Sequence, residues 1–318
     1  MERDIAIIIP AYNEEQTIRD VIVSFHLLHP AASIYVIDNN SNDATSQIAA
    51  QTFHELSIKG NVLFETRQGK SNAIRKAFRE IDSDIYVMVD ADMTYPATGL
   101  SKLLEPVVNG EADMVVGDRL ANRQYRKENK RRFHNAGNQL VRRLVNYTFS
   151  TNVRDVMSGY RVFNRLFIKN FPLMSQRFEL ETELTLHALQ FRYRIKEIPI
   201  NYLSRPSGSK SKLNTIQDGF RVVSIIFSIF KDYKPLTFFS LTSFLFFILS
   251  ISFGAFPVYE YFTLHYIYRV PLAILAMGLM LVSLLLFITG LILNTISNLH
   301  KFNYELHLLS QKNADHFS

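Results

Sequence analysis

The first part of the chain alternates short apolar runs with segments of helical pattern. The apolar runs have the length of buried strands, and they lie at residues 5–9, 34–37, 62–64, 85–89 and 114–116. Helical segments fall between these runs and begin near Glu14, Asp43, Gly69 and Thr98. Strands that alternate with helices predict an α/β fold, with a mostly parallel sheet and helices on both of its faces. We expect Asn13, with Gln16 three residues on, to cap the first helix.

The end of the chain contains longer apolar segments. Residues 236–256 and 270–296 carry no charged side chain, and a helix needs about 20 apolar residues to cross the hydrocarbon core of a membrane. A pair of buried core helices is the alternative, but such helices seldom run so long without charge. The connector at residues 257–269 is rich in tyrosine, which suits a membrane interface. The sequence therefore predicts a two-helix transmembrane hairpin at residues 235–298.

An amphipathic segment precedes this hairpin. Residues 214–231 carry apolar side chains at helical spacing along one side and polar side chains along the other. This pattern predicts a juxtamembrane helix at residues 214–234, which lies at the membrane surface or packs on the domain before it. The remaining parts are an N-terminal domain at residues 1–213 and a C-terminal tail at residues 299–318.

Charge predicts the orientation of the hairpin. Lys231, Lys234 and Lys301 flank its outer ends, whereas the connector holds Arg269 and Glu260. This bias predicts a multi-pass protein of the cell (inner or plasma) membrane, with its N-terminal domain and tail in the cytoplasm. The chain has no cysteine, which excludes disulfides and thiolate metal sites, and we expect no signal peptide. The net charge of +6 suits a lipid bilayer with anionic headgroups, and no nucleic-acid-binding motif accompanies it.

Polar residues gather just after three of the predicted strands, where ligands bind in sheets of this class. Asp90 and Asp92 follow one strand, and their oxygens can share a hard divalent cation, Mg²⁺ or Mn²⁺, that also binds a diphosphate. Asp38 follows another strand and could accept a hydrogen bond from a base or a ribose, although a turn residue is the alternative. The helix that begins near Lys70 could help to hold phosphate at its N-terminus.

Seven segments together carry a family resemblance, at residues 7–15, 38–43, 69–73, 90–92, 116–119, 155–161 and 205–213. In this order they closely resemble glycosyltransferase family 2. The later segments resemble its polyprenyl-phosphate branch, which contains the dolichol-phosphate mannose synthases and bacterial undecaprenyl-phosphate sugar transferases. The resemblance implies a GT-A fold and an inverting, metal-dependent transfer of a sugar from a nucleotide sugar to polyprenyl (undecaprenyl) phosphate. UDP-sugars are favoured over GDP-sugars, and the product would be a lipid-linked monosaccharide for modification of envelope glycans.

The resemblance also implies a role for each matching residue. The nucleotide-binding residues would be Pro10, Ala11, Tyr12, Glu14, Asp38, Lys70 and Asp90. The metal ligands would be Asp90 and Asp92, with Arg205 and Lys212 closing over the diphosphate as catalytic residues. The acceptor phosphate would meet Arg119 and Ser158, helped by either Arg131 or Arg132. Two positions depart from the pattern: Thr94 replaces an amide residue, which leaves the third metal ligand open, and Asn39 replaces an aspartate.

A catalytic base is not required by this chemistry. A phosphate monoester is mostly dianionic at neutral pH and is already a nucleophile. Asp155 is the acidic residue that we expect to act as an orienting group or an optional base, and a turn cap is its alternative. One of Glu179, Glu181 and Glu183 could approach the sugar, although acidic residues also favour helix N-termini.

Other functions fit less of the sequence. A processive polysaccharide synthase usually carries a Gln-x-x-Arg-Trp motif, and this chain has no tryptophan. A non-processive transferase for another membrane lipid remains open, as does a non-catalytic membrane-bound nucleotide-sugar sensor. A homo-oligomer is compatible with either. A basic cluster at residues 123–132 predicts a membrane-facing lid, with a solvated loop as the alternative.

Overall fold

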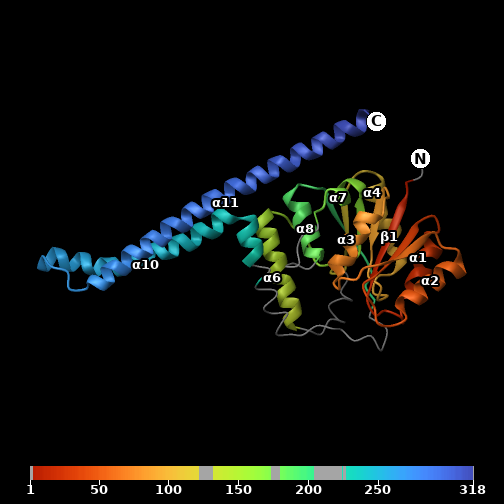
Figure 1. Cartoon of the computed structure of the whole chain (residues 1–318), viewed down its shortest axis with the longest axis horizontal. Helices are drawn as coiled ribbons and strands as arrows, with labels where there is room; N and C mark the ends of the chain where they lie inside the picture. Colours follow the sequence, from red (N-terminus) through yellow and green to blue (C-terminus); the bar gives the residue numbers. More distant parts are fainter. Residues whose placement is uncertain (1–2, 122–131, 173–179, 204–223, 225–226, 318) are drawn as a thin grey trace. The chain divides into compact units, whose positions relative to one another are not determined.

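The structure, a computed structural model, describes residues 3–121, 132–172, 180–203, 224 and 227–317. It divides into two compact units, Met1–Val222 and Val223–Ser318. The first contains the predicted sheet, and the second contains two long helices (Figure 1). Most of the predicted juxtamembrane helix lies outside the described residues, and its last part, residues 227–233, is helical.

The described part of the first unit contains one seven-stranded sheet in the order β3-β2-β1-β4-β6-β5-β7. Its strands are β1 (Ile5–Ala11), β2 (Ser33–Asp38), β3 (Gly60–Phe64), β4 (Ile85–Met88), β5 (Met114–Asp118), β6 (Arg161–Asn164) and β7 (Ile195–Pro199). β1 pairs in parallel with both β2 and β4, and β6 runs antiparallel between β4 and β5. The five predicted strands and the mostly parallel sheet are therefore confirmed.

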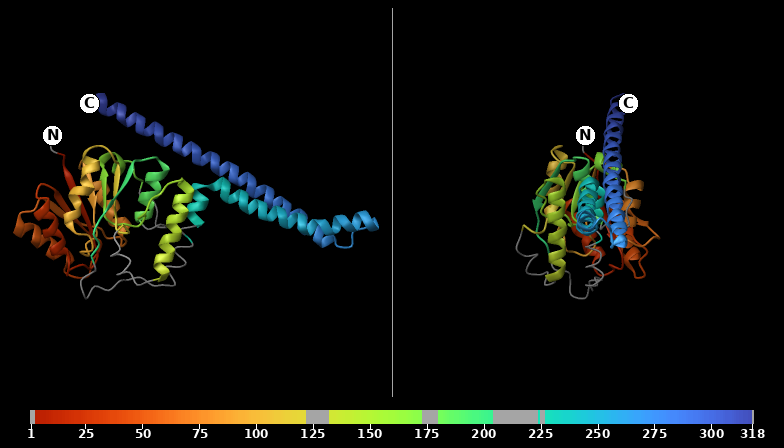
Figure 2. Two further views of the ribbon diagram at one scale, coloured as in Figure 1. Left: turned by 180° about the vertical axis from the view of Figure 1, so that it is seen from behind. Right: turned by 90° about the vertical axis from the view of Figure 1, so that its left-hand side faces the viewer.

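Helices cover both faces of the sheet, as predicted (Figures 1 and 2). On one face, Ile7, Val36 and Val87 share a core with apolar residues of α1 (Ile18–Leu28), α2 (Thr45–Leu56) and α4 (Leu100–Val108). On the other face, the ring of Phe78 in α3 (Lys70–Glu80) meets those of Tyr86 and Phe163 in the sheet. Alternate side chains of a strand point to opposite faces, so each strand contributes to both cores. The other helices in the described part of this unit are η1 (Ala97–Gly99), α6 (Arg132–Phe149), α7 (Arg165–Lys169) and α8 (Leu180–Gln190).

Asn13 does not cap the first helix, so that prediction is wrong. The helix α1 begins only at Ile18, and Asn13 lies in a turn with a φ of 54°. Its side-chain oxygen accepts a hydrogen bond from Asn42 N at 2.8 Å, and its own N–H donates to Ser41 Oγ at 3.0 Å. Asn13 therefore joins the loop after β1 to the loop after β2. Its backbone has a left-handed conformation, which asparagine tolerates better than most residues.

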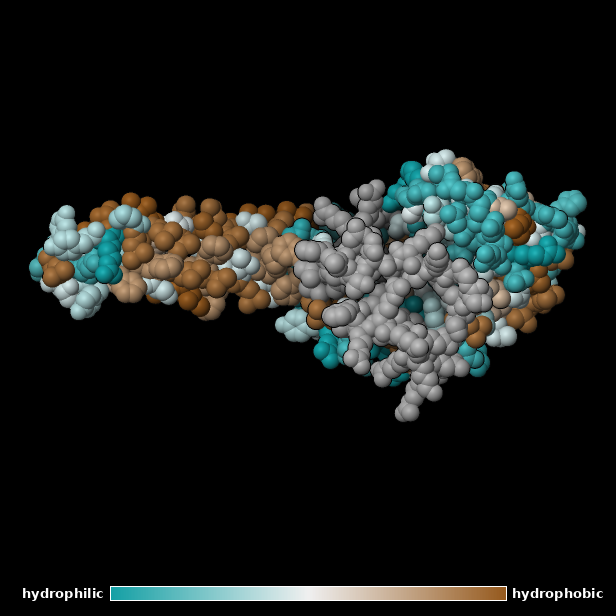
Figure 3. Space-filling view, turned by 90° about the horizontal axis from the view of Figure 1, so that it is seen from below, coloured by the Kyte–Doolittle hydropathy of each residue, from teal (hydrophilic) through white to brown (hydrophobic). Residues whose placement is uncertain are grey.

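The second unit consists mainly of α10 (Pro235–Leu264) and α11 (Val270–Phe317). Both helices are long and apolar enough to cross a membrane, and hydrophobic residues dominate the rod-like part seen in Figure 3. The connector is shorter than predicted, because α10 continues through Pro257 to Leu264. Proline removes one backbone donor, and an apolar surrounding favours keeping all the other helical hydrogen bonds.

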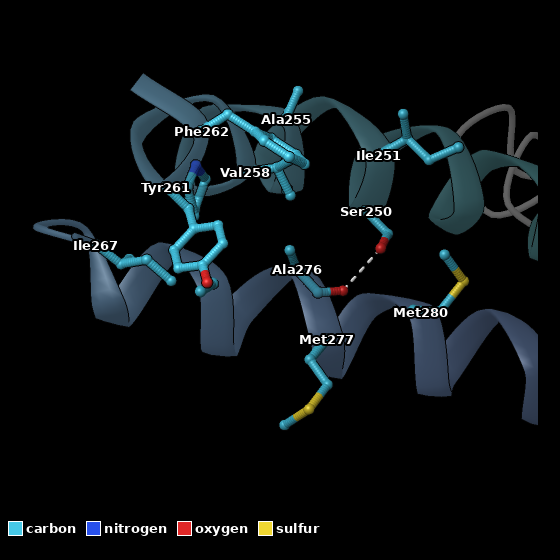
Figure 4. A pocket seen from close by; sticks show the side chains of 13 residues that line it. Ser250, Ile251, Ala255, Val258, Tyr261, Phe262, Ile267, Ala276, Met277 and Met280 are labelled. Carbon is cyan, nitrogen blue, oxygen red and sulfur yellow. Dashed lines mark hydrogen bonds between the residues drawn. The ribbon is translucent and has the colours of Figure 1, made fainter. Parts of the chain in front are cut away.

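Small polar residues hold these two helices together. Ser243 Oγ donates a hydrogen bond to the carbonyl oxygen of Ser283 at 2.8 Å, and Ser250 Oγ donates to that of Ala276 at 2.7 Å. Figure 4 shows the second contact beside an apolar pocket between the helices, near the connector. Close packing of small residues with buried hydroxyl groups is typical of helix pairs in membranes.

Gly60, at the start of β3, lies very close to the backbone of the neighbouring strand β2. Its φ is +148°, and a Cβ there would overlap the carbonyl group of Ile34 on β2. We therefore expect Gly60→Ala to lower the free energy of unfolding of this unit by about 3 kcal/mol. Gly110→Ala is the matched control, because Gly110 has a φ of +70° but no atom within 4 Å of a Cβ. It should cost only about 1 kcal/mol. Thermal unfolding followed by circular dichroism checks both, and equal losses would contradict the packing argument.

Candidate active site

Two strand ends form the first part of the site. Pro10 and Ala11 end β1, Asp38 ends β2, and the register pairs Ala11 with Asp38. Asp38 is almost fully buried, and its Oδ1 atom has no hydrogen-bond partner among the described residues. A buried carboxylate oxygen without a donor is costly unless a ligand supplies one. This acceptor therefore suits a donor group such as a ribose hydroxyl or a base N–H.

The loop after β1 brings two more predicted residues to this edge. The Tyr12 hydroxyl accepts a hydrogen bond from Gln68 Nε2 at 3.1 Å. The N–H of Glu14 donates to Thr45 Oγ1 at 2.8 Å, at the start of α2. These contacts join the loop after β1 to Gln68 and to the start of α2, and so help to position Tyr12 and Glu14.

Asn39 positions the turn that begins α3. Its Nδ2 donates to the carbonyl oxygen of Arg67 at 2.7 Å, and its Oδ1 accepts from Gly69 N at 2.6 Å. An ionised aspartate at this position could accept the second bond but could not donate the first. Asn39 therefore stabilises the turn through both of its side-chain hydrogen bonds, and the turn positions Lys70 at the site.

Lys70, the first residue of α3, lies between two carboxylates. Its Nζ donates to Asp90 Oδ1, just after β4, and to Glu181 Oε1 at 2.5 Å, in the first turn of α8. Burial alone would lower the pKa of Lys70, but the two carboxylates more than offset it and raise that pKa. Burial likewise opposes ionisation of Glu181, yet Lys70 lowers the pKa of that group. Lys70 and Glu181 are thus held in charged form, whereas burial, together with Asp92 and Glu181, raises the pKa of Asp90 in spite of Lys70.

Asp92 is buried next to this group. Its Oδ1 accepts hydrogen bonds from Thr94 N at 3.2 Å and from Thr94 Oγ1 at 2.5 Å. No three His, Cys, Asp or Glu side chains are grouped to hold a metal ion in the part of the chain that the structure describes. Two carboxylates from Asp90 and Asp92 nevertheless fit Mg²⁺ or Mn²⁺, because these ions take oxygen ligands and often complete their shell with substrate phosphates.

A second pair of charges lies beyond β5. Arg119 Nε donates to Asp155 Oδ2 at 2.8 Å, and Arg119 Nη2 donates to Asp155 Oδ1 at 3.1 Å. The guanidinium also stands 5.9 Å from the centre of the Tyr202 ring. Asp155 is held in turn, because its N–H donates to Glu197 Oε1 at 2.8 Å on β7. Burial raises the pKa of Glu197.

The structure does not describe every predicted residue. Four of them lie outside the described residues: Arg131, Glu179, Arg205 and Lys212. Residues 123–131 of the basic cluster also lie outside the described residues. Arg132 begins α6. Ser158 is fully buried, and its hydroxyl has no hydrogen-bond partner among the residues described.

Sequence reasoning missed Arg161, the first residue of β6. Its side chain is fully buried and donates to the carbonyl oxygens of Ser158 (2.8 Å) and Val156 (2.6 Å) and to Thr185 Oγ1 in α8 (2.9 Å). Burial lowers its pKa to about 10, which leaves the group protonated at neutral pH. Arg161 thus fastens the loop before β6 to α8. Only its place within a family motif could have indicated this role.

The same loop presses against Asp90. A Cβ added to Gly159 would lie 3.0 Å from Asp90 Cγ, so only glycine allows this approach. The N–H of Gly159 donates to the Tyr95 hydroxyl at 3.0 Å. Arg161 and Gly159 therefore help to fix Asp90 from the side opposite β1.

Comparison with known proteins identifies relatives of this chain. The profile described as Glycosyl transferase family 2 matches residues 6–171. Glycosyltransferase AglJ of Haloferax volcanii is 29% identical over 298 residues, which cover 93% of this chain and 95% of that protein. The Dolichyl-phosphate hexose transferase of the same organism is 28% identical over 207 residues, which cover 65% of this chain and 86% of that protein.

A solved structure confirms the fold class. Glucosyl-3-phosphoglycerate synthase from Mycobacterium tuberculosis, in complex with Mn²⁺, uridine diphosphate and phosphoglyceric acid, aligns with a TM-score of 0.55 and 20% identity. The match covers 72% of this chain and 78% of that protein. At this identity the likeness concerns the fold alone, and it confirms the expected GT-A architecture of the N-terminal unit.

Arg161→Lys tests the anchoring of the loop before β6. A lysine keeps the charge but cannot reach all three acceptors, so buried carbonyl groups lose their donors. We expect the thermal midpoint to fall by about 4–8 °C, which corresponds to about 2 kcal/mol for a domain of this size. Arg154→Lys is the control, because Arg154 is exposed and lies 4.0 Å from its partner Asp118. A midpoint unchanged in both variants would show that the buried contacts contribute nothing.

Proposed function

Because the chain belongs to glycosyltransferase family 2, we propose that it transfers a sugar from a nucleotide sugar to polyprenyl phosphate, with inversion at the anomeric carbon. The observation that supports this is one edge of the sheet: Asp90 and Asp92 follow β4, and Asp38 ends β2 on the other side of β1, with a buried Oδ1 that has no partner among the described residues. A carboxylate pair and an unsatisfied acceptor at the same edge suit a diphosphate bound through a metal ion and a nucleoside bound through hydrogen bonds. The product is a polyprenyl-phosphate-linked monosaccharide.

The nucleotide would lie across the ends of β1, β2 and β4. Asp38 would accept from the nucleoside, while Tyr12 and Glu14 would line the same edge with Pro10 and Ala11. Lys70 would meet the diphosphate at the start of α3, where the helix N-terminus also favours negative charge. A UDP-sugar is the preferred donor in this proposal, and the Mycobacterium tuberculosis synthase with the same fold holds uridine diphosphate.

Asp90 and Asp92 would hold Mg²⁺ or Mn²⁺, and this ion would neutralise charge on the diphosphate as it leaves. Arg205 and Lys212 would add positive charge to the same leaving group. The task of the protein is then to align the acceptor oxygen with the anomeric carbon and to stabilise the leaving charge. No proton has to be removed from a dianionic phosphate, so the proposal needs no catalytic base.

Arg119 would bind the acceptor phosphate, together with Ser158 and one of Arg131 and Arg132. Its fork with Asp155 favours an orienting role for Asp155, because a carboxylate that holds a guanidinium is poorly placed to take a proton. A dolichyl-phosphate transferase among the relatives supports a polyprenyl-phosphate acceptor. Undecaprenyl phosphate is the acceptor that we propose for a protein of the cell membrane.

The two apolar helices support a membrane location for this reaction. α10 and α11 would cross the cell membrane as a hairpin and keep the catalytic domain on the cytoplasmic side, next to the phosphate of the lipid acceptor. A transferase for another membrane lipid and a non-catalytic nucleotide-sugar sensor are the competing functions. The assay below separates all three.

The first experiment is turnover by the detergent-solubilised full chain with Mg²⁺ or Mn²⁺, undecaprenyl phosphate and labelled UDP- and GDP-sugars. We expect label from one donor to enter the organic phase. Asp92→Ala or EDTA should lower the rate of this transfer by at least about a hundredfold. Excess metal should restore the EDTA-treated protein. Nucleotide release without labelled lipid would favour another acceptor, and no turnover with any donor would favour the sensor. Activity that survives both treatments would contradict the metal site.

Arg119→Gln tests the acceptor side separately. Loss of a charged donor to a phosphate costs about 1.5–3 kcal/mol, so the KM for undecaprenyl phosphate should rise roughly tenfold to a hundredfold. Nucleotide affinity, measured by equilibrium dialysis, should stay within a factor of two. Arg154→Gln removes an exposed arginine nearby and serves as the control. A parallel loss of nucleotide affinity in Arg119→Gln would argue against this assignment.

A further inference from the structure

Both carboxylates of the candidate metal site already have donors from within the chain. Lys70 Nζ donates to Asp90 Oδ1, and the Thr94 hydroxyl donates to Asp92 Oδ1 at 2.5 Å. The side chains of Lys70 and Asp90 are about a third exposed (32% and 27%), so solvent and ligands can reach this pair. A metal ion that binds here must displace or tolerate an ammonium group at its own ligand.

The ammonium opposes a metal ion more strongly than a neutral donor would. Lys70 carries a full positive charge in contact with Asp90, and two cations at one carboxylate repel each other in a partly desolvated site. No third acidic or histidine ligand is grouped with the pair among the described residues. The free protein therefore offers a divalent cation few ligands, and an ammonium group contacts one of them.

A nucleoside diphosphate reverses this balance. Its anionic oxygens would supply additional metal ligands and would offer Lys70 a new acceptor, which would leave Asp90 available to the metal ion. Glu181 matters at this step because it holds the same ammonium from the other side, at 2.5 Å. Lys70 can then leave Asp90 without losing every carboxylate partner.

The position of Glu181 is itself fixed. Thr185 lies one turn further along α8, and its hydroxyl accepts from Arg161 at 2.9 Å and donates to the carbonyl oxygen of Glu181 at 2.9 Å. Arg161 is fully buried, so this end of α8 is tied to the loop that presses on Asp90. Asp90 and Glu181 thus lie on either side of the Lys70 ammonium group, and the same loop contacts both of their surroundings.

We infer that Lys70 makes metal binding conditional on nucleotide binding, and that Glu181 is the positioning residue that retains Lys70 when the metal ion takes Asp90. The inference rests on the proposed function for the identity of the nucleotide. It assigns to Lys70 a task before the reaction, in addition to contact with the diphosphate. The metal ion and the nucleotide should therefore bind cooperatively.

The test measures Mn²⁺ binding to the full-length protein in detergent by electron paramagnetic resonance, with and without saturating UDP. In the unaltered protein UDP should tighten Mn²⁺ binding by at least tenfold. In Lys70→Gln the protein without UDP should bind Mn²⁺ about tenfold more tightly, and UDP should tighten binding by a smaller factor than in the unaltered protein, because only its own metal ligands remain to act. Lys70→Arg keeps the charge and should keep the dependence on UDP. Equal Mn²⁺ affinity in Lys70→Gln and the unaltered protein would overturn the inference.

Lys76→Gln is the matched control. It removes the same charge from the same helix, but Lys76 pairs with Glu80 on the helix surface at 2.6 Å, so Mn²⁺ binding should not change. Glu181→Gln should weaken Mn²⁺ binding to the free protein when Lys70 is present and should matter less in the Lys70→Gln background. An equal effect in both backgrounds would remove Glu181 from the inference.

Binding of UDP and GDP to the unaltered protein separates this inference from the proposed function. If a nucleotide binds and sugar transfer occurs, but Lys70→Gln leaves Mn²⁺ binding unchanged, the inference alone fails. GDP replaces UDP in the test if it is the nucleotide that binds. If neither nucleotide binds, the proposed function and the inference fail together.

Discussion

The parallel pairing of β1 with both β2 and β4 is the constraint on which the site depends. Parallel neighbours end at the same edge of the sheet, so three separate loops meet there without any further instruction from the sequence. Asn39 N donates to the carbonyl oxygen of Ala11 at 2.9 Å, and Thr17 Oγ1 donates to that of Ala91 at 2.7 Å. These contacts hold the three loops together at the shared edge, and they thereby help to position the acidic residues.

A second constraint is the cost of burying carboxylates, which here accept hydrogen bonds from donors within the chain. Buried carboxylates are costly unless they are paired, and here each has its donor: Lys70 for Asp90, Thr94 for Asp92 and Arg119 for Asp155. The exception is the Oδ1 atom of Asp38, which has no partner in the described part of the chain. Most of the site is thus preorganised, and binding exchanges one set of partners for another.

The sequence was sufficient for features that depend on local pattern. Apolar runs indicated the first five strands, and the position of Asp90 and Asp92 after a strand indicated the edge at which they lie. It could not indicate contacts between distant segments. Lys70 and Glu181 are 111 positions apart, and no periodicity relates them. Arg161 looks like an ordinary surface residue until the antiparallel strand β6 buries it, and Asn13 looked like a helix cap because the turn before α1 has no pattern of its own.

The length of α11 has a consequence for the C-terminal end of the chain. The helix contains 48 residues without a break, and at about 1.5 Å per residue it is about 72 Å long. The hydrocarbon core of a bilayer is only about 30 Å thick, so a helix that crosses it must extend well beyond the membrane as a continuous rod. Residues 299–317 are then a rigid helical extension of the membrane-spanning part of α11. Any tilt of the helix in the bilayer moves this extension through a wider arc than the part within the membrane.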